Sequence, residues 1–243
     1  MVDVVIIGGG VIGLSIAREI SKSGRETIVL EKNDRTGDAT SSRNSGVIHA
    51  GIYYPEDFLK SKLCVEGNRL IYEYAKSKKI NHKQYGKFII ATSESELSNL
   101  ESILIQGKRN KVEIFEVEKE RVLENNPGLS FHEALYSPSS GVIDVPEFVT
   151  ALEGDIQHFG GLISLRTSFL SSSREKKKFK INCKADDYFS IESNCLINCS
   201  GLSNEITLKN IENFPTDKIY PNYYAKGHYF KYSGKSPFSN LIY

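Results

Sequence analysis

The stretch Val4-Val-Ile-Ile-Gly-Gly-Gly-Val-Ile-Gly13 places a run of glycines directly after an apolar, β-branched segment. Such a segment is typical of a buried parallel strand, and residues 11–23 continue with apolar side chains at helical spacing. Gly8, Gly10 and Gly13 occupy the glycine positions of Gly-x-Gly-x-x-Gly between this strand and this helix. In that pattern the glycines permit a tight turn, close approach of a diphosphate, and close packing of helix on strand. The stretch therefore predicts a dinucleotide at the helix start, with a glycine-rich turn lacking a ligand as the alternative.

A second strand is predicted at residues 27–30, directly before Glu31. Together with the strand at 3–7 and the helix at 11–23 it makes a βαβ unit, whose crossover we expect to be right-handed. Glu31 follows Gly10 by about 20 residues, the spacing at which an acidic residue accepts hydrogen bonds from the adenosine ribose. The sequence thus predicts an α/β fold built on a parallel sheet.

The composition gives no reason to expect a nucleic-acid or metal partner. Lys and Arg total 31 against 30 Asp and Glu, which leaves a formal net charge of +1. The four cysteines include no Cys-x-x-Cys pair, and no histidines cluster as zinc ligands do. We find neither a signal-peptide pattern nor the ~18 consecutive apolar residues that span a bilayer. We therefore expect a cytoplasmic protein with reduced thiols, no metal site and no transmembrane segment.

The loop at residues 32–56 is rich in Ser, Asn and Gly and is long for a connection without structure of its own. Loops of this kind usually carry function. Its part from Thr40 to Tyr54 offers hydroxyl groups and small residues that can line the far side of a diphosphate and reach a flavin ring. This favours FAD over NAD, and a polar surface loop is the alternative.

Three segments together resemble the D-amino acid oxidase superfamily of FAD-dependent oxidoreductases: residues 1–31, residues 40–54 and Cys195-Leu-Ile-Asn-Cys-Ser-Gly201. The resemblance implies FAD as cofactor, with the last segment closing over it after a parallel strand. The FAD-binding residues predicted from the motif and the resemblance are Gly8, Gly10, Val11, Ile12, Gly13, Glu31, Lys32, Ser41, Ser42, Asn44, Ser45, Gly46, Ser200 and Gly201.

Within this superfamily, residues 43–54, 62–67 and 225–230 resemble the L-2-hydroxyglutarate dehydrogenase/oxidase group. Residues 48–53 are also similar to glycerol-3-phosphate dehydrogenases. The first resemblance implies oxidation of a small 2-hydroxy acid, L-2-hydroxyglutarate, with hydride transfer to flavin N5. An enzyme acting on glycerol-3-phosphate or an amine, and a non-catalytic flavin-binding fragment, are the alternatives. Oxygen, a quinone or a carrier protein remain open as electron acceptor, and a quinone would imply peripheral contact with the inner membrane.

His49 is the candidate catalytic base, because an imidazole of near-neutral pKa suits proton transfer at working pH. The alternative is a histidine that only packs against or hydrogen-bonds the flavin. A dicarboxylate substrate needs cationic or hydroxyl partners, for which Tyr53, Tyr54 and Lys226 are candidates, with Arg43 near the cofactor. Packed tyrosines and a solvated lysine are the alternative for these residues.

We predict a Rossmann-type FAD-binding domain from residues 1–80 and 140–205. A mostly β substrate domain is expected from residues 81–139 and 206–243, with a strand-rich segment at 220–232. Members of the superfamily continue beyond the length seen here, so the resemblance implies that the substrate domain is incomplete.

Overall fold

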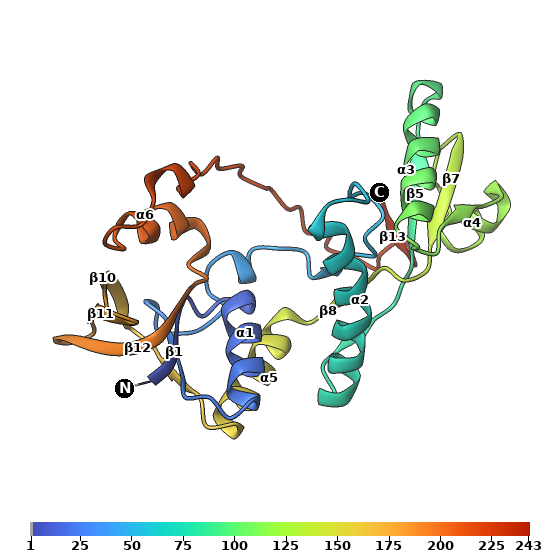
Figure 1. Ribbon diagram of the computed structural model, residues 1–243. Coiled ribbons are helices and arrows are strands. Elements are labelled where there is room, and N and C mark those ends of the chain that lie inside the picture. Colours follow the sequence, from blue (N-terminus) through green and yellow to red (C-terminus); the bar gives the residue numbers. More distant parts are fainter. Residues whose placement is uncertain (1) are drawn as a thin grey trace. The chain divides into compact units, whose positions relative to one another are not determined.

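The computed structural model describes residues 2–243, which divide into two compact units (Figure 1). Unit 1 comprises residues 1–44 and 145–227, and unit 2 comprises residues 45–144 and 228–243. Each unit therefore combines segments that are far apart in the sequence.

A six-stranded sheet forms the centre of unit 1. Its strand order is β10-β11-β12-β1-β2-β9, with β1, β2, β9 and β12 parallel and the β10-β11-β12 end antiparallel. The strands are β1 (Val2–Ile7), β2 (Thr27–Leu30), β9 (Leu162–Ser164), β10 (Ser168–Glu175), β11 (Lys178–Lys184) and β12 (Tyr188–Asn198). The predicted βαβ unit and parallel sheet are confirmed, and the carboxyl ends of β1, β2 and β12 meet at one edge.

Helices α1 (Val11–Lys22) and α5 (Val145–His158) pack against each other in unit 1 (Figure 1). The buried face of α1 carries Leu14 and Ala17, both fully inaccessible to solvent. The other face of the sheet packs Val5 and Leu30 against Ile181 of β11. The unit also contains α6 (Asn204–Lys209) and the 3-10 turns η1 (Thr40–Ser42), η3 (Gly201–Ser203) and η4 (Thr216–Lys218).

Unit 2 is a mixture of helices and short strands, where we expected mostly strands. One sheet has the order β13-β5-β7-β6, and a smaller one has the order β3-β8-β4. The elements are β3 (Val47–Ile48), α2 (Leu59–Lys78), β4 (His82–Lys83), β5 (Lys87–Ala91), η2 (Glu94–Glu96), α3 (Leu97–Arg109), β6 (Phe115–Glu116), α4 (Lys119–Asn125), β7 (Glu133–Ser137), β8 (Gly141–Ile143) and β13 (Leu241–Ile242). Helix α3 packs on one face of the larger sheet through Leu100 and Leu104, and α4 packs on the other through Val122.

The boundaries of the units differ from the predicted domain boundaries. Helix α2, which we assigned to the FAD-binding domain, belongs to unit 2. Its Asn68 amide donates to the backbone oxygens of His49 and Ser139 at 3.0 and 2.9 Å, and the Tyr72 hydroxyl also donates to Ser139 O. These bonds join the helix to the residues that follow β3 and precede β8. The assignment of a cofactor domain and a substrate domain stays a prediction.

The prediction of a strand-rich segment at 220–232 was wrong, because residues 219–240 contain neither helix nor strand. A strand needs a neighbouring strand to pair with its backbone groups, and no described strand runs beside this segment. Its aromatic side chains stay exposed, with Tyr223 at 91% and Phe230 at 100%.

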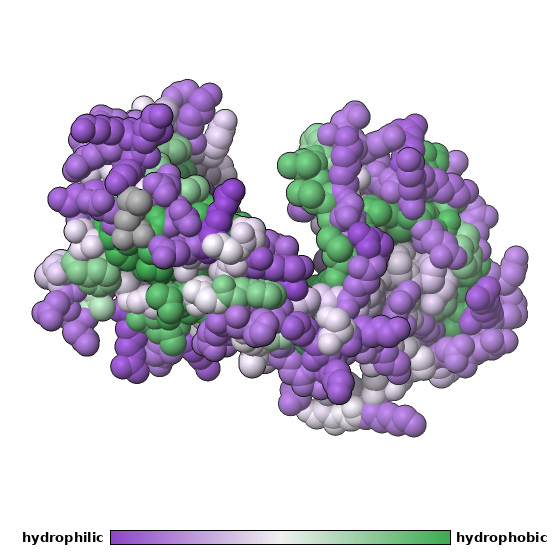
Figure 2. Space-filling view, turned by 60° about the horizontal axis from the view of Figure 1, so that its bottom comes forward, coloured by the Kyte–Doolittle hydropathy of each residue, from purple (hydrophilic) through white to green (hydrophobic). Residues whose placement is uncertain are grey.

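The visible surface is mostly hydrophilic, with smaller hydrophobic patches between (Figure 2). Within residues 2–243, none of the helices combines the length and apolar character that a bilayer crossing requires.

We expect Asp155→Ala to lower the free energy of unfolding by about 3 kcal/mol, because the partly buried Arg18 guanidinium loses its buried carboxylate partner. Arg18 Nε donates to Asp155 Oδ2 at 2.7 Å across the α1–α5 contact, and the Asp155 side chain is only 6% exposed. Urea-induced unfolding followed by circular dichroism measures the change. Glu19→Ala is the control, since that carboxylate also contacts Arg18 but is 63% exposed, and its loss should cost less than about 1 kcal/mol. Equal effects of the two variants would contradict the expectation.

Candidate functional site

The glycine turn after β1 is too crowded for any side chain. Gly8 has φ +106°, and a Cβ placed on it would lie 2.4 Å from the backbone oxygen of Cys199. A Cβ on Gly13 would lie 2.0 Å from the backbone oxygen of Gly8. Real Cβ atoms do not approach backbone so closely, so the turn requires glycine at both positions. The turn thereby brings the start of α1 against the loop that follows β12.

Helix α1 begins at this turn with amide groups that lack intrahelical partners. Gly10 is the N-cap residue, and no acidic side chain lies in the first turn. The amide of Val11 donates to Ser41 Oγ at 3.0 Å. Within residues 2–243 no acceptor reaches the amides of Ile12 and Gly13. Open amides at the positive end of a helix dipole are a favourable environment for a phosphate group.

Glu31, at the carboxyl end of β2, is 7% exposed and supports the glycine turn directly. Its Oε2 accepts from the Gly9 amide at 2.7 Å, and its Oε1 accepts from the Asn33 amide at 2.9 Å. A carboxylate has about four acceptor sites, so both oxygens can still accept from another donor. Contact of Glu31 with ribose hydroxyls stays a prediction.

The loop after β12 is held by a small polar network. Asn198 Oδ1 accepts from the Ser200 amide at 3.1 Å and from the Ser200 hydroxyl at 2.7 Å. The buried Thr207 hydroxyl donates to Ser200 Oγ at 2.9 Å. These bonds fix Ser200 and Gly201 close to Gly8. The signal for Asn198 in the sequence is an Asn that ends a parallel strand, a residue type that hydrogen-bonds its own turn.

The structure therefore brings the predicted residues Gly8, Gly10, Val11, Ile12, Gly13, Glu31, Ser41, Ser200 and Gly201 together at one sheet edge of unit 1. This set fits the diphosphate end of FAD, because it combines open amides with glycines that let a ligand approach the backbone. Ser42 and Asn44 hydrogen-bond to the backbone of their own loop, and Lys32 is exposed. Their cofactor contacts, and those of Ser45 and Gly46 in unit 2, stay predictions.

His49 follows β3 in unit 2 and is exposed. Partial burial of its ring lowers its pKa below the ordinary value, and the positive charges of Lys87 and Lys60 lower it further. The imidazole is therefore neutral at pH 7 and has a ring nitrogen that can accept a proton. Its backbone oxygen accepts from the Asn68 amide, which fixes the loop at this point.

Tyr53 and Tyr54 belong to the same loop as His49, and Asn110 holds that loop in place. Asn110 ends α3, is 8% exposed, and donates through Nδ2 to the backbone oxygens of Gly51 and Tyr54, both at 2.8 Å. The Tyr53 hydroxyl is buried without a hydrogen-bond partner in the described part of the chain. Lys226 is exposed in unit 1 and thus belongs to a different unit from the two tyrosines.

Sequence reasoning missed Asn68, Asn110 and Lys87, because each contacts the loop at 49–54 from a distant point in the chain.

Within residues 2–243, no group of His, Cys, Asp or Glu side chains is arranged to hold a metal ion.

Comparison with known proteins gives a family match over nearly the whole chain. The model of the family described as "FAD dependent oxidoreductase" (DAO) matches residues 3–242. The mitochondrial L-2-hydroxyglutarate dehydrogenase of Arabidopsis thaliana is 34% identical, over all of this chain and 56% of its own length. A glycerol 3-phosphate dehydrogenase of Caloramator mitchellensis is also 34% identical, over 83% of this chain and 42% of its own length. The chain spans about half the length of these relatives.

Solved structures agree with this family. The glycine oxidase of Geobacillus kaustophilus superimposes with a TM-score of 0.77 at 21% identity, covering 86% of this chain and 58% of its own, which shows a common fold. The L-alpha-glycerophosphate oxidase of Mycoplasma pneumoniae, solved with FAD bound, gives a TM-score of 0.75 at 25% identity, covering 80% of this chain and 53% of its own.

We expect Glu31→Ala to weaken FAD binding roughly tenfold to a hundredfold, because the glycine turn loses a charge-assisted hydrogen bond that fixes Gly9. Fluorescence titration of the protein with FAD measures the dissociation constant. Asp34→Ala is the matched control, since this exposed carboxylate lies in the same loop. Wild-type FAD affinity in Glu31→Ala would show that the turn does not depend on the carboxylate.

Proposed function

This chain belongs to the DAO family of FAD-dependent oxidoreductases, and on that premise we propose that the protein oxidises a small 2-hydroxy acid, L-2-hydroxyglutarate, to its 2-oxo acid. The proposed substrate rests on the match to an L-2-hydroxyglutarate dehydrogenase over the full length of this chain. Relatives of the same name in Dictyostelium discoideum and Bos taurus match 75% and 82% of the chain.

We assign FAD binding to residues of unit 1 and proton transfer to a residue of unit 2. The glycine turn and Glu31 in unit 1 hold the diphosphate and ribose end of FAD, which supplies the two-electron acceptor when bound. In unit 2, the neutral His49 imidazole takes the proton of the substrate hydroxyl. Bound FAD would supply the acceptor, flavin N5, for the hydride that Cα of the substrate loses as its hydroxyl carbon becomes a ketone. Tyr53, Tyr54 and Lys226 are proposed to contact the substrate.

Glycerol 3-phosphate is the second candidate substrate, because a dehydrogenase named for it matches 83% of this chain at the same identity. The electron acceptor remains open between oxygen, a quinone and a carrier protein. We propose a cytoplasmic location, with peripheral membrane contact if a quinone accepts the electrons. Several relatives are named as mitochondrial proteins, so the cytoplasmic location needs its own experimental test.

The substrate proposal is tested with the protein expressed from the whole reading frame that contains this chain, loaded with FAD. Under anaerobic conditions we expect L-2-hydroxyglutarate to bleach the visible absorbance of the bound flavin. The D-enantiomer, glycerol 3-phosphate and glycine are the comparison substrates. Bleaching by glycerol 3-phosphate alone would transfer the proposal to that substrate, and a flavin that no substrate bleaches would favour a non-catalytic role.

We expect His49→Ala to slow flavin reduction by roughly a hundredfold or more, since a positioned base contributes 10²–10⁴. The rate in the wild type should fall as the pH drops through the pKa of His49, below 6.5, because only the neutral ring accepts a proton. Above that pKa the rate should be level, and the variant should lack this step. Stopped-flow absorbance at a series of pH values measures both. His82→Ala, an exposed histidine of unit 2, is the control, and an unchanged reduction rate in His49→Ala would remove His49 as the base.

A further inference from the structure

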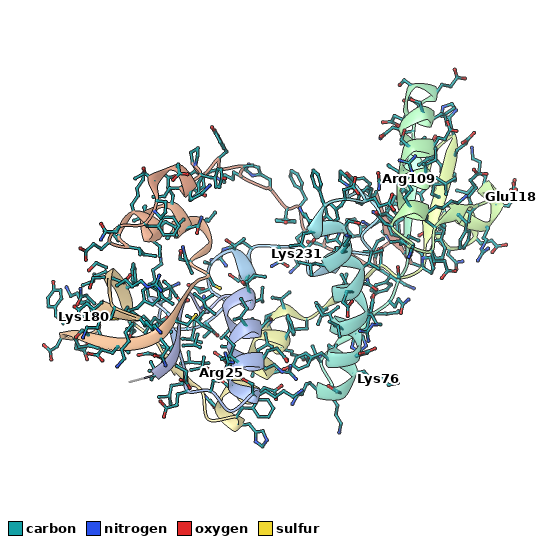
Figure 3. All side chains as sticks on the ribbon, in the orientation of Figure 1. Arg25, Lys76, Arg109, Glu118, Lys180 and Lys231 are labelled. Atoms are coloured by element: carbon teal, nitrogen blue, oxygen red, sulfur yellow. The ribbon has the colours of Figure 1, made fainter. Side chains whose placement is uncertain are left out.

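Lys87 is a buried lysine in a chain whose lysines are otherwise mostly on the surface. Its side chain lies on β5 and the residue is 6% exposed, whereas Lys76 and Lys180 are exposed (Figure 3). Side chains alternate between the two faces of a strand, so Lys87 shares its face with Ile89 and Ala91. That is the face covered by α3 and by the loop that carries His49. A charged group has therefore been placed at the margin of the larger hydrophobic core of unit 2.

No carboxylate in the described part of the chain pairs with the Lys87 ammonium. Two aromatic rings lie beside it: Nζ is 5.3 Å from the ring centre of Tyr53 and 5.2 Å from that of Tyr243. The two rings are 5.3 Å apart and inclined at 48°. Cation–π contacts offset part of the cost of burying a lysine, yet burial still lowers the pKa of Lys87. The ammonium thus has hydrogen-bond donors that no acceptor uses.

A second unused donor belongs to the Tyr53 side chain, whose ring Lys87 contacts. The Tyr53 hydroxyl is buried and has no hydrogen-bond partner among residues 2–243. Buried polar groups in native proteins are normally satisfied, so an orphaned hydroxyl beside an orphaned ammonium indicates an acceptor that binds both. The charge of Lys87 also acts on the His49 ring, which places the candidate base within its field.

We propose that Lys87 and Tyr53 bind a carboxylate group of the substrate, with the ammonium and the phenol both donating to its oxygens. This inference rests on the proposed function and adds the residues that recognise the acid. A carboxylate is the acceptor that matches the site, because it carries the missing negative charge and accepts two hydrogen bonds from one side. It would hold the carbon that bears the hydroxyl near His49, and it would disfavour uncharged alcohols, which leave the ammonium unpaired.

The test uses the FAD-loaded protein from the whole reading frame and glutarate as a probe that binds without reacting. Perturbation of the flavin absorbance by glutarate gives its dissociation constant. We expect Lys87→Met, which keeps the length of the side chain and removes the charge, to raise this constant and the KM for L-2-hydroxyglutarate roughly 10- to 100-fold. Tyr53→Phe, a change of one hydroxyl that is expected to fold, should raise both by roughly 3- to 10-fold. Lys83→Met is the control, because Lys83 is exposed and also lies over a tyrosine ring, at 4.5 Å.

Unchanged glutarate affinity in both Lys87→Met and Tyr53→Phe would overturn the inference. Equal loss in Lys83→Met would overturn it as well, since a general loss of positive charge would then explain the effect. Inorganic phosphate and glycerol 3-phosphate are titrated in parallel, and a loss of affinity for these two with glutarate unaffected would contradict a carboxylate site. Glutarate binding that depends on Lys87 in a protein that oxidises no 2-hydroxy acid would overturn the proposed function and leave the carboxylate site standing.

Discussion

The contact between the glycine turn and the loop after β12 is the constraint on which the rest of unit 1 depends. The backbone of Gly8 approaches Cys199 so closely that no side chain fits between them, and Gly13 brings α1 equally close to Gly8. This approach fixes where α1 starts relative to the carboxyl ends of β1, β2 and β12. Because the free amides of α1 and the carboxylate of Glu31 then face one edge of the sheet, the same contact that builds the core also builds the cofactor site.

In unit 2, side-chain hydrogen bonds hold an irregular loop in one conformation. The loop from His49 to Tyr54 has little regular structure, and its backbone groups need partners elsewhere. Asn68 on α2 and Asn110 at the end of α3 supply those partners through their side-chain amides. Two helices thereby fix a loop that belongs to neither, and the loop carries the candidate base together with a tyrosine of the candidate substrate site.

Lys87 and Tyr53 place two polar groups in an environment that is unfavourable for both. A buried ammonium beside two aromatic rings, and a buried phenol that finds no acceptor among residues 2–243, both oppose folding, and apolar residues of similar size would pack there more favourably. Such a pair is retained where a ligand completes it. Burial lowers the pKa of His49, and the charge of the same ammonium lowers it further.

The sequence by itself determined the βαβ unit and the glycine turn, because these depend on residues close together in the chain: an apolar strand, a glycine pattern and an acid one strand later. It also determined the family, through the resemblance of residues 1–31, 40–54 and 195–201. Only the tertiary structure decided the unit boundaries, the unpaired segment at 219–240, and the contacts of Asn110 and Lys87. Those features depend on which distant segments meet. A lysine that follows a glycine at the start of a strand has the same local pattern whether it faces water or a core, and only long-range packing buries it.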